Sequence, residues 1–234
     1  MSLPIGTLVN VVTVLVGGAI GAVAGSRFPE RFRTTLMATL GLITAALGIR
    51  ETMATGEFPL VIAAVLVGVL LGESLRIEQG LERFGRFLQS RVSSEDLSGG
   101  GQRRFSEGFV LASLVFCVGP LTVVGSIRDG LGDHEMLLVK AALDGFASIA
   151  FAAVYGWGVA LAAMTVAVVQ GGLAVAGGAL DGLLTDPMID ALATAGGILL
   201  LGIALRLLDL KQVRVANMLP AIALAPLFVA WWGA

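Results

Sequence analysis

Eight apolar runs, each close to the length that crosses a lipid bilayer, constrain this chain more than any other feature of its sequence. About 20 apolar residues in helical conformation cross the roughly 30 Å of hydrocarbon in a bilayer. The runs lie at about 5–25, 33–49, 58–75, 108–127, 136–155, 157–180, 188–207 and 214–233. We therefore expect an all-α polytopic membrane protein with about eight transmembrane helices in one transmembrane domain, residues 1–234.

The composition agrees with a membrane environment and excludes several soluble functions. Of the 234 residues, 56% are hydrophobic and 14% charged, against roughly 25% charged in soluble domains. The mean hydropathy is +0.92. A net charge of −2 gives no electrostatic support for nucleic-acid binding. One cysteine and one histidine exclude a disulfide framework and a Cys/His zinc site. We expect no enzyme, no cofactor and no metal.

The arginines and lysines predict an orientation. Cytoplasmic loops of membrane proteins carry an excess of Lys and Arg. With both termini outside, 12 of the 15 positive residues fall in inner segments, and only Arg50, Arg128 and Lys140 fall outside. We therefore expect a multi-pass protein of the bacterial inner membrane with both termini outside.

One extended polar stretch, residues 76–104, lies between the third and fourth runs. Ile77, Leu81, Phe84 and Leu88 recur at helical spacing with charged residues between them, which indicates an amphipathic helix in the cytoplasmic interface. The segment SSEDLSGGGQ that follows has the composition of a flexible linker. The stretch is either a simple connector or a lipid-sensing element.

The chain echoes itself weakly. VGGAIGAVAG at 16–25 is similar to VQGGLAVAGG at 169–178, and LMATLGLITAALGIR at 36–50 is similar to LATAGGILLLGIALR at 192–206. The charge pattern gives spans 1–3 and spans 6–8 opposite orientations. We therefore predict an inverted repeat of two three-helix units flanking spans 4 and 5, a plan typical of secondary transporters.

The fourth run contains the strongest helix-breaking signal. Pro120 lacks an N–H and clashes with the preceding turn, and Gly119 permits unusual dihedral angles. We expect an interruption near the midplane that frees backbone carbonyls around Phe116 and Cys117. Such backbone persists only when it is buried in protein or lines a wet cavity. The break therefore either coordinates a solute or ion, or is a packed structural kink.

Ionisable and amide side chains at membrane depth are the other candidate site residues. Asp144 lies in the fifth run, with Lys140 one turn earlier on the same helix face. Intramembrane charges usually face the bundle interior and mark a pathway or a paired site. Asn10, Gln170 and Asn217 are amides at membrane depth, and amides suit either ion coordination or interhelical hydrogen bonds.

Small-residue stripes suggest close helix packing. Gly17, Gly21 and Gly25 form one stripe, and Gly68 and Gly72 form another. Either stripe fits an intramolecular seam or a dimer face. From these stripes we expect a homodimer.

Several motifs together resemble a bacterial membrane family known as domain-of-unknown-function family 554, the YdfK/YqgA-like proteins. The matching segments are GTLVN at 6–10, SLVFCVGPLTVVGSIRDGL at 113–131, KAALDG at 140–145, VVQGG at 168–172 and NMLP at 217–220. The resemblance implies a bacterial inner-membrane protein and no substrate. Its motifs fall on Asn10, Gly119-Pro120, Asp144, Gln170 and Asn217.

These features favour a small secondary transporter or ion-conducting protein. The expected path for a small solute or ion combines the polar or broken positions named above: Asn10, Phe116, Cys117, Gly119, Pro120, Asp144, Gln170 and Asn217. The alternative is a non-transporting membrane scaffold or envelope protein in which polar residues only join helices. The expected partners are the lipid bilayer, a small solute or ion, and a second copy of the chain.

Overall fold

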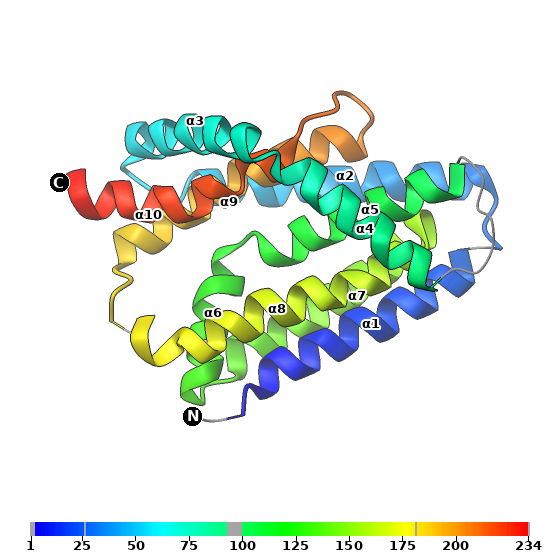
Figure 1. The fold of residues 1–234 in the computed structure, drawn as a ribbon, viewed down its shortest axis with the longest axis horizontal. Coiled ribbons are helices and arrows are strands. Elements are labelled where there is room, and N and C mark those ends of the chain that lie inside the picture. Colours follow the sequence, from blue (N-terminus) through cyan, green and yellow to red (C-terminus); the bar gives the residue numbers. More distant parts are fainter. Residues whose placement is uncertain (1–2, 26, 93–99, 181, 234) are drawn as a thin grey trace. The chain divides into compact units, whose positions relative to one another are not determined.

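The computed structural model describes residues 3–25, 27–92, 100–180 and 182–233, and these residues form helices and no strand. In chain order the elements are α1 (Ile5–Gly25), α2 (Glu30–Thr52), α3 (Phe58–Leu75), α4 (Ile77–Val92), α5 (Gly100–Cys117), α6 (Pro120–Leu131), α7 (Glu135–Tyr155), α8 (Trp157–Leu180), α9 (Asp186–Leu207), the 3₁₀ helix η1 (Val215–Met218) and α10 (Pro220–Trp232). Figure 1 shows this course.

The predicted apolar runs all become helices. Seven described segments are long and apolar enough to cross a membrane, and α5 with α6 makes an eighth if this bent pair is one span. The all-α membrane fold is therefore confirmed. The second span is longer than expected, Glu30–Thr52, and the last begins as a 3₁₀ turn before Pro220. The predicted inverted repeat stays a prediction.

The chain divides into two compact units. Unit 1 comprises Met1–Met37, Gln79–Cys117 and Leu121–Gly178, and unit 2 comprises Ala38–Glu78, Val118–Pro120 and Ala179–Ala234. The single transmembrane domain expected over 1–234 therefore stays a prediction. Within the expected 76–104 segment, residues 77–92 form helix α4. The first seven residues of the expected linker, 93–99, lie outside the described residues, and its last three, 100–102, begin α5.

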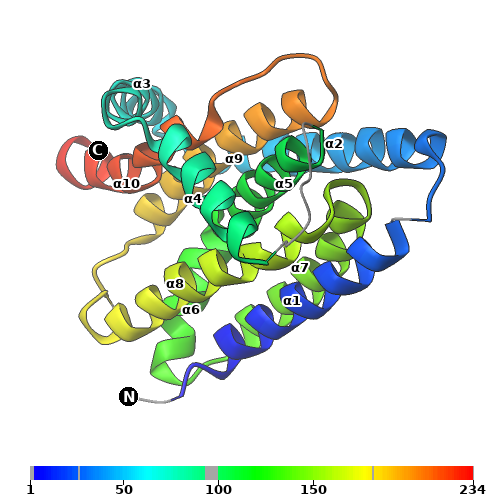
Figure 2. The ribbon, with the colours of Figure 1, turned by 45° about the vertical axis from the view of Figure 1, so that its right-hand side comes forward.

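Unit 1 is built on a glycine seam between α1 and α7, which run side by side with α8 in both ribbon views (Figures 1 and 2). A Cβ added at Gly17, Gly21 or Gly25 would come within 2.2–2.5 Å of α7 backbone oxygens. Those oxygens belong to Gly145, Ile149 and Ala153, so the contacts advance together along both helices. Helices α1 and α7 are therefore parallel and in close backbone contact.

Helix α5 runs in the opposite direction to α7 within unit 1. Gly108 of α5 contacts Tyr155 near the end of α7. Further along α5, the ring of Phe116 lies 6.3 Å from that of Phe151. Contact positions therefore rise on one helix while they fall on the other, which makes the two helices antiparallel.

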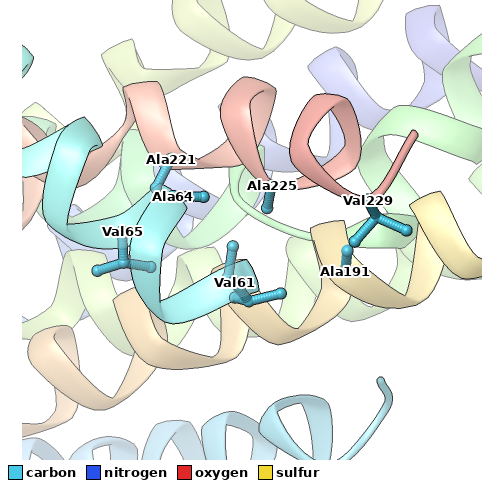
Figure 3. Packing of buried hydrophobic residues seen from close by; sticks show 8 residues of the cluster. Val61, Ala64, Val65, Ala191, Ala221, Ala225 and Val229 are labelled. Carbon is cyan, nitrogen blue, oxygen red and sulfur yellow. The ribbon is translucent and has the colours of Figure 1, made fainter. Parts of the chain in front are cut away.

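Unit 2 has an alanine- and valine-rich core between α3, α9 and α10. Figure 3 shows its buried side chains: Val61, Ala64, Val65, Ala191, Ala221, Ala225 and Val229. The second glycine stripe lies here. A Cβ at Gly68 would come within 2.7 Å of the Ala221 nitrogen, and one at Gly72 within 1.9 Å of the Asn217 oxygen. Both glycine stripes are thus covered by helices of the same chain.

Candidate functional site

Four polar side chains meet inside unit 1 where α1, α7 and α8 adjoin. Asn10 of α1 and Gln170 of α8 are fully buried. Lys140 and Asp144 of α7 are 6% and 8% exposed. We call these four residues the unit 1 polar cluster. Three of the sequence-predicted site residues, Asn10, Asp144 and Gln170, are therefore brought together.

Asp144 is the centre of the cluster. Its Oδ2 atom accepts hydrogen bonds from Asn10 Nδ2 at 3.0 Å and from Lys140 Nζ. Asn10 Nδ2 also donates to Gln170 Oε1 at 3.1 Å. The amide group of Asn10 thus links the carboxylate on α7 to the amide on α8.

Local sequence explains how these side chains meet. Lys140 and Asp144 are four residues apart, so they lie on one face of α7. The glycine seam brings α1 close enough for Asn10 to reach that face. Thr13 strengthens the contact, because its hydroxyl donates to the Ala141 carbonyl oxygen at 2.9 Å. Charged side chains are costly in contact with hydrocarbon, so a pair inside a membrane usually faces the interior of the helix bundle, as it does here.

The charge on Asp144 fixes the orientation of both amides. An ionised carboxylate only accepts hydrogen bonds, so Asn10 must present Nδ2 to it. The same Nδ2 group then faces Gln170, which must present Oε1. This leaves Asn10 Oδ1 and Gln170 Nε2 buried without a hydrogen-bond partner among the described residues. One free acceptor and one free donor therefore remain inside the cluster, and buried groups of this kind usually find partners.

The predicted helix break is present. Helix α5 ends at Cys117 and α6 begins at Pro120, with a 66° bend between their axes. Cys117, the last residue of α5, belongs to the same unit as the cluster. The freed carbonyl of Phe116 accepts a hydrogen bond from the Thr122 hydroxyl at 3.0 Å. That carbonyl is thus satisfied within the chain.

Gly119 lies at the break itself. A Cβ built there would have no atom within 4 Å. The glycine is therefore not required by close packing, and open space adjoins the backbone at this point. Pro120 starts α6, where its missing N–H is no loss because the first N–H groups of a helix have no intrahelical partner.

Sequence reasoning missed a second buried carboxylate in unit 1. Asp129 is fully buried and accepts the backbone N–H groups of Gly6 and Thr7, each at 2.8 Å. Its Oδ1 atom also lies 2.6 Å from His134 Nδ1. The carboxylate therefore caps the first turn of α1 from α6. The only signal in the sequence was that GTLVN and SIRDGL both belong to the family motifs.

Asn217 does not join the unit 1 polar cluster, because it belongs to unit 2. Its Oδ1 atom accepts the backbone N–H of Glu78 at 2.8 Å. Glu78 in turn accepts from Arg206 Nη1 at 2.9 Å and from the Ala216 N–H at 3.2 Å. These contacts hold Glu78, at the start of α4, against η1 and α9. Such contacts stabilise the fold and do not indicate a path.

The described residues offer no cluster of metal-binding side chains. Among the described residues, no three His, Cys, Asp or Glu side chains gather in a way that could hold a metal ion. The described free thiol, Cys117, is half-buried.

A buried charged cluster within a bundle of membrane-length helices defines a polytopic α-helical membrane protein with internal polar groups. The chain belongs to the family described as "Protein of unknown function (DUF554)", whose model matches residues 5–230. It is 31% identical to "Uncharacterized protein YqgA" of Escherichia coli (strain K12) over 97% of each chain. It is 29% identical to "Uncharacterized membrane protein YdfK" of Bacillus subtilis (strain 168), over 96% of this chain and 95% of the relative. No solved structure matches the chain significantly.

Proposed function

We propose that this protein is a secondary transporter or ion-conducting protein for a small solute or ion, rather than an enzyme. The observation that carries the proposal is the unit 1 polar cluster. It brings together an acid, a base and two amides on membrane-length helices, all four buried, with one free acceptor and one free donor. Ionisable groups at that depth are costly and typically mark a path for ions or solutes.

The helix break supports the same function. Broken helices in transporters expose backbone and helix ends to the transported species. Here α5 ends at Cys117, in the same unit as the cluster, and α6 begins at Pro120. A break of this kind gives the two arms of the broken span a way to move independently.

Helix direction supports the proposed topology. Because α1 and α7 are parallel and α5 is antiparallel to α7, the α5–α6 pair runs opposite to α1. That direction is expected if the bent pair crosses the membrane as one span, which gives eight crossings and both termini on one side. The 12-to-3 distribution of positive residues then favours an outer location for the termini. Helical spans favour the bacterial inner membrane, because outer-membrane proteins are typically β-barrels.

A non-transporting scaffold is the second candidate function, and one observation favours it. Lys140 and Asp144 already form a closed ion pair, and the glycine seam packs α1 tightly on α7. In a scaffold these polar groups would only join helices. A homodimer also remains a proposal, but not through the two glycine stripes, because helices of the same chain cover both.

Ligand-dependent stabilisation of the purified protein tests the proposed function. A ligand that binds only the folded state raises the unfolding temperature. We expect at least one ion or small metabolite to do so for the wild type, and the shift to disappear in Asp144→Asn. The matched control is Asp190→Asn, because Asp190 is exposed on α9. A scaffold predicts no ligand-dependent shift, and no flux in proteoliposomes, for any compound in the panel.

A further inference from the structure

Helix α4 has one apolar flank against α5 and a second apolar flank that is exposed. On the first flank, a Cβ added at Gly85 would lie 3.2 Å from the Phe109 ring, and Leu88 is buried. Both ribbon views show α4 beside the first part of α5 (Figures 1 and 2). On the second flank, Phe84 is 45% and Phe87 52% exposed, with their rings stacked at 6.5 Å. Exposed apolar surface of this kind, rimmed by polar residues, marks an interaction site.

The neighbours of α4 in the fold place it at a membrane surface. Helix α3, which is long and apolar enough to cross a membrane, ends at Leu75, and α4 begins at Ile77. Arg76 between them is left-handed (φ 53°) and ends α3. On α5, the contacts of α4 lie at residues 106–109, near the start of the apolar bent pair α5–α6 at Arg104. Helix α4 therefore lies where apolar spans meet a polar surrounding.

The polar side of α4 offers arginines to a partner. The two acids of the described helix are already paired, Glu78 with Arg206 at 2.9 Å and Glu82 with Arg86 at 3.8 Å. The second pair is exposed and therefore weak, so its arginine can also bind a phosphate. Arg83 is exposed and forms no ion pair among the described residues. The exposed rings thus lie on the same helix as two available guanidinium groups.

We propose that α4 binds the anionic phospholipid surface of the membrane, on the side where α3 ends. The rings of Phe84 and Phe87 enter the boundary between headgroups and acyl chains, and the guanidinium groups of Arg83 and Arg86 bind lipid phosphates. Charge complementarity selects this partner. Residues 76–104 hold six arginines against four acids, and arginine clusters of this size beside a span are typical of anionic-lipid recognition. The inference is independent of the proposed transport function.

A second copy of the chain fits this surface less well. In a symmetric dimer the same patch meets itself, so Arg83 and Arg86 would approach the same charges of the other copy. Like charges brought together across an interface oppose binding. An anionic lipid surface instead offers phosphates to the arginines and hydrocarbon to the phenylalanines.

Exposure of a label on α4 to an aqueous quencher tests the inference. The label is a bimane at Ser90→Cys, an exposed position of α4, in the full chain with Cys117→Ala. The vesicles contain phosphatidylcholine alone, or equal parts of phosphatidylglycerol and phosphatidylcholine, with neutral acrylamide on both sides. We expect less quenching in the vesicles with phosphatidylglycerol. The difference should disappear in about 1 M NaCl, where charges act over roughly 3 Å.

The decisive variant is Arg83→Gln combined with Arg86→Gln, which should be quenched equally in the two lipids. Lysine at both positions should keep the difference, because it retains the charges. The matched control is Arg50→Gln combined with Arg128→Gln. These two arginines are exposed, each pairs with an acid, and both lie outside α4, so the control should behave as the wild type.

The apolar contribution is tested in the same vesicles. Phe87→Ala should raise the quenching in phosphatidylglycerol vesicles, because the ring no longer holds α4 at the boundary. Phe146→Ala is the control, since Phe146 is 74% exposed but lies on α7, and it should leave the quenching unchanged. Monodisperse elution on size exclusion verifies the fold of each variant.

Three outcomes would overturn the inference. The first is equal quenching of the wild type in the two lipids. The second is a lipid difference that persists in the Arg83→Gln, Arg86→Gln variant. The third is quenching that rises as the protein is diluted in the membrane, which would indicate that a second copy covers α4. Each of these outcomes leaves the proposed transport function standing, because none of them involves the unit 1 polar cluster.

Discussion

The carboxylate of Asp129 accepts the backbone N–H of Gly6 at 2.8 Å, although the two residues are 123 positions apart. The neighbouring Thr7 donates both its N–H and its hydroxyl to the same carboxylate. A Cβ at position 6 would lie 2.8 Å from the carboxylate oxygen, so glycine is required for this approach. The start of α1 is thereby attached to the end of α6.

Asp129→Asn should destabilise the fold. The two N–H groups bind different oxygens of the carboxylate. An asparagine replaces one of these oxygens with an NH2 donor that faces an N–H group, so at least one buried hydrogen bond is lost. Removal of one partner from a buried hydrogen bond costs about 1–3 kcal/mol. A lower midpoint of thermal unfolding in detergent measures the effect. The neighbouring Asp133→Asn is the control, because the Asp133 side chain is exposed, and an equal shift in both variants would contradict the role of Asp129.

Gly21→Val should disrupt the seam between α1 and α7. The added Cβ would lie 2.2 Å from the Ile149 backbone oxygen, and backbone cannot move aside as a flexible side chain can. Overpacking of this kind costs about 1–3 kcal/mol or more. The yield of monodisperse protein on size exclusion measures it. Gly171→Val is the matched control, because no atom lies within 4 Å of a Cβ built there. Its yield should equal that of the wild type.

Glu78→Gln and Arg206→Gln should each destabilise unit 2 strongly. Both side chains are 9% exposed, and breaking a buried pair leaves an uncompensated charge, at about 3–5 kcal/mol. The double variant should cost less than the sum of the single variants, as a double-mutant cycle of unfolding would show. Glu73 and Arg214 form an exposed pair, for which we expect a coupling below about 1 kcal/mol. Additive effects at Glu78 and Arg206 would show that their contact contributes nothing.

Labelling should place Gly100 inside and Thr185 outside. This outcome follows from the proposed topology, in which the bent α5–α6 pair crosses the membrane as one span. Single cysteines at the two positions, in a Cys117→Ala background, would react with a membrane-impermeant maleimide from opposite sides. Thr185 on the inner side would instead make the bent pair a re-entrant loop and leave seven crossings.

The spans, the helix break and the Lys140–Asp144 pair could be predicted because each depends on residues close together in sequence. Apolar run length gives the spans, Gly119-Pro120 gives the break, and a spacing of four residues gives the pair. The contact between Asp129 and Gly6 could not be predicted in this way. Asp129 follows Arg128 near a helix end, a context that resembles an ordinary surface acid, and its partners are backbone N–H groups far along the chain.

Glycine stripes were ambiguous for a different reason. The spacing of Gly17, Gly21 and Gly25 is the same whether the partner helix belongs to this chain or to a second copy. The burial of Glu78 could not be predicted either. An acid in an amphipathic helix usually faces water, whereas Glu78 pairs with Arg206. Long-range partners of this kind follow from helix packing, which local patterns do not specify.

Pro120→Ala should reduce the 66° bend between α5 and α6. Alanine restores an N–H and removes the ring that clashes with the preceding turn, so residues 118–120 can become helical. Spin labels at Arg104 and Arg128, both exposed, would report the change by pulsed electron resonance. A straight helix would place these Cα atoms ~36 Å apart, and the bent pair places them closer.

Pro187→Ala, at the start of α9, is the control and should leave the distance between the two labels unchanged. If Pro120→Ala also leaves it unchanged, the bend is set by the Thr122–Phe116 hydrogen bond and by neighbouring helices, and Thr122→Val in the Pro120→Ala background should then lengthen the distance.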